Sequence, residues 1–196
     1  MIITRAPLRV GLFGGGSDFE AYFSRKRGAV LGCAITSYVW ISGVRLRGLQ
    51  SYNFRLAYRQ VEAVQRVGDL LQPLIRSAIS EYWGEEELDL SITSDLPSNS
   101  GLGTSSACAV SIVYLLKLLR GIDSARAELA MEANRLVRRI LRENCGFQDP
   151  YHSAYGGLNM FEFTNEGISI RPISTDATEV KEFLDTLWLI PVGGQR

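Results

Sequence analysis

The segment from Leu96 to Ala107 combines glycine and hydroxyl residues in a pattern that suits the binding of an anion. Gly101 and Gly103 allow the backbone to approach a bound group closely. The hydroxyl residues at 104–106 can donate hydrogen bonds or ligate a metal ion. The same pattern also occurs where a glycine turn leads into a core helix that Ser or Thr caps. The segment alone leaves both interpretations open.

The flanking residues place this segment between a strand and a helix. Apolar and polar residues alternate over 88–93, which predicts a half-buried strand. Residues 108–119 are nearly all apolar and end before Gly121, which predicts a buried helix. The first N–H groups of a helix lack partners within it, and the helix dipole is positive at that end. An anion held by the loop would therefore meet favourable groups.

Two familiar phosphate-binding motifs are excluded. The P-loop requires a lysine directly after its last glycine, and the sequence has no lysine between Lys26 and Lys117. The dinucleotide-binding fingerprint requires a third glycine, and Ser106 occupies that position.

A second group of candidate residues lies near the N-terminus. Residues 2–13 are strand-forming and include Arg5 and Arg9. A charge in a strand that packs in a core needs a partner, because an unpaired buried charge is costly. Three consecutive glycines follow at 14–16; they permit close approach of the backbone to another group, or they form a flexible turn.

A third group lies at 144–152, after a helix predicted over 123–143. A glycine followed closely by an acid is expected to place the Asp149 carboxylate in a loop, although Asp before Pro also initiates turns. His152 is the only histidine, and no Ser or Cys nucleophile is arranged with it. The sequence therefore predicts a structural role for His152 and no hydrolase triad.

The remaining elements follow from apolar periodicity. Strands are predicted at 28–44, 158–163, 168–173 and 187–192, of which the second and third form a hairpin. Helices are predicted at 69–83, 123–143 and 179–184. Ser17 and Glu20 have the spacing of a capping box, which predicts a helix that continues through Phe23. Residues 46–60 are typical of irregular or edge-strand sequence.

The composition is that of a soluble globular protein. Of 196 residues, 46% are apolar and 21% are charged, and the formal net charge is zero, so no general attraction to nucleic acid or to an anionic membrane is expected. The longest apolar run, 110–119, is too short to span a bilayer, and no signal peptide is recognised. Three cysteines without Cys-x-x-Cys spacing favour reduced thiols and a cytoplasmic location.

Three segments, taken in order, resemble the motifs of the GHMP kinases. Residues 5–18 resemble the first motif, which sets the substrate pocket, and residues 97–107 resemble the second, which is the ATP phosphate loop. Residues 146–149 resemble the segment that carries the catalytic aspartate. The Gly-Gly-Gly-Ser-Asp, Gly-x-Gln-Asp and Tyr-Gly-Gly-Leu-Asn sequences are most similar to the sugar-kinase branch that includes D-glycero-D-manno-heptose 7-phosphate kinase.

The resemblance implies an α+β fold with a mixed sheet packed on helices. Residues 1–178 would form the N-terminal domain of such a kinase, which binds ATP and substrate. Residues 179–196 would begin a C-terminal ferredoxin-like domain that is largely missing, together with the third glycine-rich motif of the family.

The resemblance also implies the roles of individual residues. The ATP phosphates would be held by Pro97, Ser100, Gly101, Leu102, Gly103, Thr104, Ser105 and Ser106. The substrate would be held by Arg5, Gly15, Gly16, Ser17, Asp18 and Gln148. Asp149 would lie beside the attacking hydroxyl, as base or as electrostatic orienter. Arg9 would pair with Asp149 and stabilise charge rather than transfer a proton, because arginine stays protonated.

Magnesium ligands are less completely matched. Ser105 is the candidate hydroxyl ligand of Mg²⁺. Relatives place an acidic ligand on the helix before the catalytic aspartate, where this chain has Val137, Arg138 and Arg139. Glu132 could substitute for it only if the helix were shifted.

The resemblance implies ATP-dependent phosphorylation of a sugar or sugar phosphate, with ATP and Mg²⁺ as cofactors. The expected substrate is a heptose 7-phosphate, phosphorylated at its anomeric hydroxyl. The alternative is a truncated, non-catalytic fragment that binds nucleotide or sugar. No nucleic-acid or membrane partner is expected, and a homodimer would be one way to cover the apolar edge that a missing domain leaves.

Overall fold

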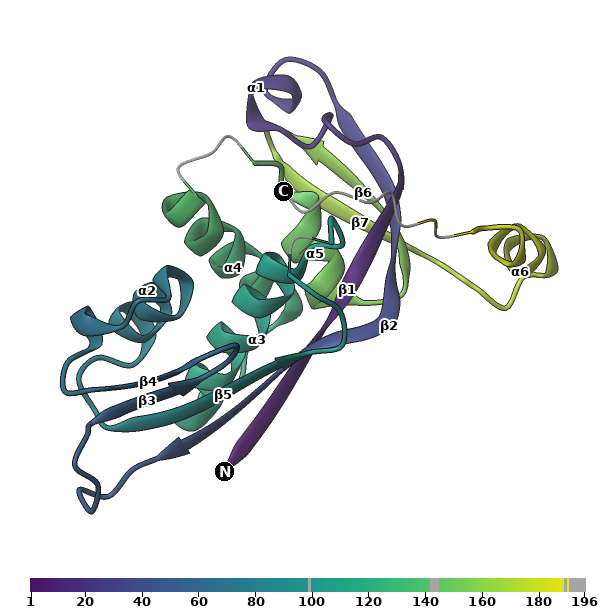
Figure 1. Cartoon of the computed structure of the whole chain (residues 1–196). Coiled ribbons are helices and arrows are strands. Elements are labelled where there is room, and N and C mark those ends of the chain that lie inside the picture. Colours follow the sequence, from purple (N-terminus) through teal and green to yellow (C-terminus); the bar gives the residue numbers. More distant parts are fainter. Residues whose placement is uncertain (99, 142–144, 189, 191–196) are drawn as a thin grey trace.

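A mixed seven-stranded sheet forms the centre of the molecule (Figure 1). The computed structural model describes residues 1–98, 100–141, 145–188 and 190. The strands are β1 (Ile2–Phe13), β2 (Gly28–Arg45), β3 (Phe54–Ala57), β4 (Val61–Val64), β5 (Leu88–Ser94), β6 (Leu158–Thr164) and β7 (Gly167–Ile173).

The long strand β2 organises the sheet. One of its edges pairs antiparallel with β1 from Ile2 to Phe13. Its other edge pairs with β6 over residues 28–33 and with β5 over residues 39–45, both antiparallel. The strand order is β4-β3-β5-β2-β6-β7, with β1 beside β2, and β3 runs parallel to β5. The predicted fold class, a mixed sheet with helices, is confirmed.

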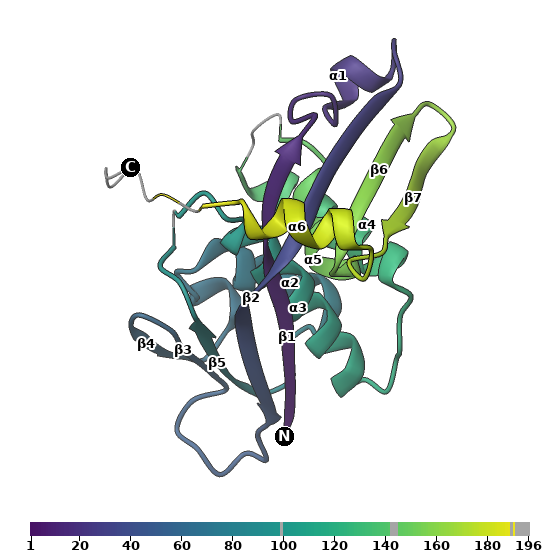
Figure 2. The same cartoon turned by 90° about the vertical axis from the view of Figure 1, so that its right-hand side faces the viewer.

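Helices α2 to α5 cover one face of this sheet (Figures 1 and 2). The helices are α1 (Glu20–Phe23), α2 (Pro73–Tyr82), α3 (Thr104–Leu119), α4 (Arg126–Leu141), α5 (Gln148–Tyr155) and α6 (Thr178–Asp185), with a short 3-10 helix at Val67–Asp69. Figure 2 shows α6 crossing the opposite side of the sheet, and none of its residues is buried. No helix among the described residues is long and apolar enough to cross a membrane.

Two hydrophobic clusters fill the space between the sheet and the helices. The larger surrounds α3, whose residues from Ser106 to Val113 are all buried. The smaller lies under α5 and contains Val30, Ala130, Tyr151, Phe161 and Phe163. Burial of α3 on every side except its ends explains why its sequence is apolar without a clear stripe.

Several element boundaries differ from the sequence prediction for local reasons. The helix predicted over 69–83 begins at Pro73, because proline is suited to the first helical position and the Gln72 side chain accepts a hydrogen bond from Ile75 N. The strand β4 was not predicted, because four residues are too few to show alternation. It makes β3 an inner strand and is itself the edge.

Two predicted features are wrong. The helix over 20–23 exists, but Ser17 does not cap it: the Ser17 hydroxyl donates to the carbonyls of Gly14 and Ala29 and accepts from Ala29 N. The residue before α1 is Phe19, which provides no side-chain cap. Asp149 lies in the first turn of α5 and not in a loop.

The hairpin at 158–173 and the short helix near 179–184 are confirmed. The strand predicted at 187–192 includes residues 189, 191 and 192, and the helix predicted over 123–143 includes 142 and 143, all of which lie outside the described residues. Leu187 and Trp188 lie in neither a helix nor a strand.

Candidate active site

Arg9 joins the three segments that the sequence singles out. Its Nε donates to Asp149 Oδ1 over 2.7 Å, and its terminal nitrogen Nη2 donates to Asp149 Oδ2 over 2.6 Å. Its other terminal nitrogen, Nη1, donates to the Gly101 carbonyl over 2.7 Å. Only 15% of the Arg9 side chain is exposed, against 31% for Asp149. This partial burial makes the bidentate pair stronger than a solvated surface pair.

Arg9 lies beside an irregularity in the sheet. The pairing of β1 with β2 shifts between Pro7 and Arg9. The extra residues belong to β2, where Tyr38 pairs with Pro7 and Ala34 with Arg9. Arg9 itself bonds to Asp149 of α5, on the helix-covered face of the sheet. Arg5 instead lies on the opposite face, exposed over the rings of Tyr38 and Trp40 at 4.5 and 5.1 Å from their centroids. Arg5 was predicted to bind substrate, but the structure places it away from Arg9 and Asp149.

The N-terminus of α3 faces the phosphate-loop residues and has no side-chain cap. Its N-cap residue, Gly103, has a φ of +77°, and Gly101 has the same left-handed conformation. A Cβ at Gly103 would lie 3.2 Å from Cγ of Arg9, so the glycine lets the arginine lie against the loop. The buried Thr104 hydroxyl oxygen has no hydrogen-bond partner among the described residues. The first backbone N–H groups of α3 are thus available for an anion.

The other predicted phosphate-loop residues lie around this helix end. Pro97 and Ser100 are exposed in the loop before α3. Leu102 is partly buried, and its carbonyl accepts a hydrogen bond from Arg9 N over 3.0 Å. Ser106 is buried in α3.

Aromatic packing holds Asp149 in place by fixing α5. The rings of Tyr151, His152 and Tyr155 all meet Phe161 of β6, with centroids 4.7–6.0 Å apart. Pro150 is buried in the first turn, where the missing N–H costs no helical hydrogen bond. The carboxylate therefore projects from a helix that the core immobilises.

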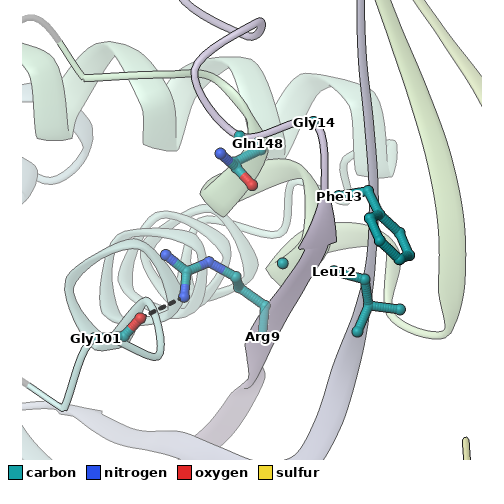
Figure 3. A pocket seen from close by; sticks show the side chains of 8 residues that line it. Arg9, Leu12, Phe13, Gly14, Gly101 and Gln148 are labelled. Carbon is teal, nitrogen blue, oxygen red and sulfur yellow. Dashed lines mark hydrogen bonds between the residues drawn. The ribbon is translucent and has the colours of Figure 1, made fainter. Parts of the chain in front are cut away.

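A pocket of about 330 Å³ opens between β1, the glycine turn and α5 (Figure 3). Its lining residues are Arg9, Gly11, Leu12, Phe13, Gly14, Gly15, Gly101 and Gln148. Of the predicted substrate residues, Gly15 and Gln148 lie in this wall. The strand residues at 11–13 were missed, although their position just before the triple glycine was a signal.

Asp18 lies beneath this wall and is fully buried. Its Oδ1 accepts hydrogen bonds from Gly16 N and Gln148 Nε2, and its Oδ2 accepts one from Gln148 N, at 3.0–3.2 Å. Phe147 N also donates to the Asp18 carbonyl. Gly16 and Ser17 are likewise used within the chain, because the Ser17 hydroxyl ties the turn to β2.

The two predicted magnesium ligands lie elsewhere. Glu132 bonds to the buried Lys117 over 2.9 Å, near the C-terminal end of α3. A helix rises about 1.5 Å per residue, so this pair is on the order of 20 Å along α3 from Thr104. Ser105 is exposed in a separate hollow, which it shares with Gln72, Pro73, Leu74, Val137 and Ile140. The described residues contain no cluster of three or more His, Cys, Asp or Glu side chains that could hold a metal ion.

His152 lies in the same helix as Asp149 and is fully buried. Neither of its ring nitrogens has a hydrogen-bond partner among the described residues. Burial, with a smaller contribution from the positive charge of Arg9, lowers the pKa of His152 to about 4 against an opposing effect of Asp149. The ring is therefore neutral at pH 7.

Comparison with known proteins finds similar kinases. Residues 69–157 match the family model described as GHMP kinases N terminal domain. D-glycero-alpha-D-manno-heptose 7-phosphate kinase of Campylobacter jejuni is 28% identical over 182 residues, which cover 88% of this chain and 54% of that protein. Galactokinase of Thermotoga neapolitana is 23% identical over 156 residues, which cover 78% and 43% respectively.

A solved structure also resembles the whole fold. The crystal structure of a D-glycero-D-manno-heptose 1-phosphate kinase from Bacteriodes thetaiotaomicron superposes with a TM-score of 0.79 at 27% identity, and covers 89% of this chain and 60% of that one. The chain spans about half the length of the curated relatives named above. The predicted resemblance is confirmed: residues 69–157 match the model of the N-terminal domain of the GHMP kinases, and the fold is similar to that of a sugar kinase of known structure.

Proposed function

We propose that this protein transfers the γ-phosphoryl group of ATP to a hydroxyl group of a sugar or sugar phosphate. The observation that carries the proposal is the set of three hydrogen bonds from Arg9 to Asp149 and Gly101. They join the Asp149 carboxylate and the glycine-rich loop before α3 to one guanidinium, which lines a pocket. Phosphoryl transfer needs little more than such positioning and charge neutralisation.

The ATP phosphates would lie against the uncapped N-terminus of α3. The left-handed glycines and the lack of a side-chain cap from any described residue support this placement, because they leave the first backbone N–H groups of α3 free to donate. Mg²⁺ bound to ATP would neutralise phosphate charge, and it usually keeps several waters and needs only one or two protein oxygens. The lack of a carboxylate cluster among the described residues is compatible with a metal ion that arrives with the nucleotide.

Asp149 would act on the attacking hydroxyl. In the transfer, the hydroxyl oxygen forms a bond to the γ-phosphorus, the bond from that phosphorus to the β–γ bridging oxygen breaks, and ADP leaves. Asp149 would accept the hydroxyl proton or orient the hydroxyl. Each of its oxygens receives one hydrogen bond from Arg9 and retains a further lone pair for this purpose.

The proposed substrate is a heptose 7-phosphate, with its anomeric hydroxyl as the acceptor. Support comes from two relatives that are both described as heptose phosphate kinases, at 28% and 27% identity. The galactokinase match at 23% identity makes a free sugar the natural comparison substrate. A cytoplasmic location fits such a substrate and belongs to the same proposal.

The test is ADP production with a panel containing D-glycero-D-manno-heptose 7-phosphate, the free heptose, galactose and mevalonate. We expect turnover with the heptose phosphate, and a loss of about 10²- to 10⁴-fold in Asp149→Asn, because the variant keeps the shape but cannot accept a proton. Asp176→Asn, an exposed residue before α6, is the matched control. ATP binding without turnover on any sugar would instead favour the non-catalytic nucleotide-binding alternative.

A further inference from the structure

We propose that Gln148 determines substrate specificity by presenting a hydrogen-bond acceptor to the pocket, and that buried Asp18 fixes this polarity. The inference rests on the proposed function, since it concerns the sugar that the same pocket would hold. It assigns Asp18 a positioning role in place of direct contact with substrate.

The polarity follows from the hydrogen bonds of Asp18. A carboxylate only accepts hydrogen bonds, so the side-chain nitrogen of Gln148 must face it. The reverse amide orientation would bring the Gln148 oxygen against a fully buried negative oxygen. The backbone N–H of Gln148 also donates to Asp18, so the residue is held at two points.

The side-chain oxygen of Gln148 is consequently left for the pocket. Figure 3 shows this oxygen turned toward the side of Arg9 and the nitrogen turned away from it. A Cβ at Gly11, on the pocket floor, would lie 3.2 Å from Gln148 Oε1, which places the oxygen directly over that strand residue. Within the described part of the chain, Oε1 has no hydrogen-bond partner, while Nε2 has Asp18.

Glycines make this arrangement sterically specific. A Cβ at Gly146 would come within 1.9 Å of Asp18 Oδ2, so only glycine leaves room for the carboxylate at that point. The Gly-Phe-Gln-Asp sequence therefore contains three linked parts. Gly146 leaves room for the Asp18 carboxylate, and Asp18 orients Gln148 through hydrogen bonds. The next residue, Asp149, is held by Arg9.

The charges around the pocket determine which ligand group fits. Arg9 is the only charged residue among those described as lining it, and its guanidinium is already engaged by Asp149 and Gly101. Arg138 of α4 lies over the neighbouring Phe147 ring. An acceptor at Gln148 therefore selects a hydroxyl group that donates a hydrogen bond, and it disfavours a phosphate or carboxylate at this position.

The first test uses steady-state KM values for the heptose phosphate at saturating MgATP. Gln148→Met keeps the length and removes the acceptor, so we expect a KM about 10- to 100-fold higher with the KM for ATP unchanged. Gln148→Glu keeps an acceptor at this place only while its proton is donated to Asp18, because two ionised carboxylates there would repel each other. Its KM relative to wild type should therefore be near one at pH 6 and rise toward pH 9.

A double variant supplies the rescue. In Asp18→Asn/Gln148→Glu, the new amide can donate to the new carboxylate, which again presents an oxygen to the pocket. We expect this pair to bind the sugar better than Gln148→Glu at pH 9 and to lose its pH dependence. Gln50→Glu, an exposed residue after β2, is the matched control. The polarity assignment is overturned if Gln148→Glu behaves like Gln148→Met at every pH.

A second test does not depend on turnover. The side-chain amide protons of Gln148, identified by NMR from their loss in Gln148→Glu, should exchange with solvent more slowly than those of Gln50. Exchange as fast as that of Gln50 overturns the inference even in an active enzyme. Slow exchange in a chain without activity contradicts the proposed kinase function and supports the orientation of Gln148.

Discussion

At the scale of single residues, the guanidinium of Arg9 does what no other cation could do at this position. It reaches a carboxylate with two parallel donors and a backbone carbonyl with a third. A lysine ammonium is a point charge on a flexible stem and cannot hold both groups in a fixed plane. The relative placement of Asp149 and the phosphate loop therefore depends on arginine.

Arg9→Lys tests this dependence on shape at constant charge. We expect kcat/KM for the sugar to fall about 10- to 100-fold, because the bidentate pair and the bond to Gly101 cannot both be kept. The unfolding midpoint should change little, since the charge is retained. Arg59→Lys, in the exposed turn between β3 and β4, is the control. Unchanged kcat/KM in Arg9→Lys would show that the positive charge alone is sufficient.

Gly103→Ala tests the close contact between the loop and Arg9. The new methyl group would lie 3.2 Å from Arg9 Cγ and would displace the arginine or the loop. We expect ATP to bind about tenfold more weakly, measured by titration calorimetry. Gly121→Ala is a matched control, because Gly121 has nearly the same positive φ and open space around it. Equal effects on ATP binding in both variants would attribute the loss to backbone strain.

At the scale of elements, α3 and α4 are joined by a buried charge cluster. The Lys117 ammonium bonds to Glu128 over 2.6 Å and to Glu132 over 2.9 Å, with 10% of the lysine side chain exposed. A buried ammonium needs its partners, so the cluster fixes the two helices against each other. This structural use accounts for the acidic residue that the sequence offered as a metal ligand.

Glu132→Ala separates the structural role from metal binding. We expect a loss of about 1–2 kcal/mol in unfolding free energy, because the lysine keeps only one carboxylate. Urea denaturation measures this loss, and the magnesium concentration needed for half-maximal ATP binding should stay the same. A higher magnesium requirement would restore Glu132 as a ligand.

Elements with strong patterns could be predicted, and those set by tertiary contacts could not. Residues 2–13 are rich in strand-forming residues and form β1 as predicted. The eight-residue helix α5 was missed because Asp-Pro at its start is typical of a turn, while its stability comes from rings packed on Phe161. Ser17 has the spacing of a cap, but a second candidate partner, the β2 backbone at Ala29, takes its hydroxyl.

At the scale of the whole molecule, one layer of helices closes the core against the sheet, and His152 is enclosed between the two. Burial lowers the pKa of His152 to about 4, whereas an unfolded histidine titrates near 6.5. Between these values the unfolded chain binds more protons than the folded chain. Folding stability is therefore complete above pH 6.5 and declines as pH falls toward 4, by up to about 3 kcal/mol.

His152→Leu should remove this part of the pH dependence. Neither ring nitrogen bonds to a described residue, so an apolar side chain of similar size leaves no donor or acceptor unpaired. We expect similar urea midpoints for the variant and wild type at pH 7, and a more stable variant at pH 5. A wild-type protein that loses no more stability than the variant between pH 7 and pH 5 would contradict a neutral buried ring.

The pairing of Arg9 with Asp149 could be predicted from the sequence, whereas most other contacts around the candidate site could not. Three motifs that are far apart in sequence do converge, through Arg9, Gly101 and Asp149. The different surroundings of Arg5 and Arg9 could not be predicted from apolar alternation, because both residues are arginines in one strand. The burial of Asp18 depends on Gly146, which lies more than a hundred residues away along the chain.

The most direct test of the phosphate site is a backbone amide NMR titration of the whole chain with MgATP. We expect the largest shifts at residues 101–106 and at Arg9, displacement by ADP, and weaker binding in Gly103→Ala. Bound nucleotide should also raise the unfolding free energy, by about 2.7 kcal/mol at a hundred times its Kd. Shifts confined to another surface, or no shifts at millimolar MgATP, would contradict the assignment of residues 97–106 as the ATP phosphate loop.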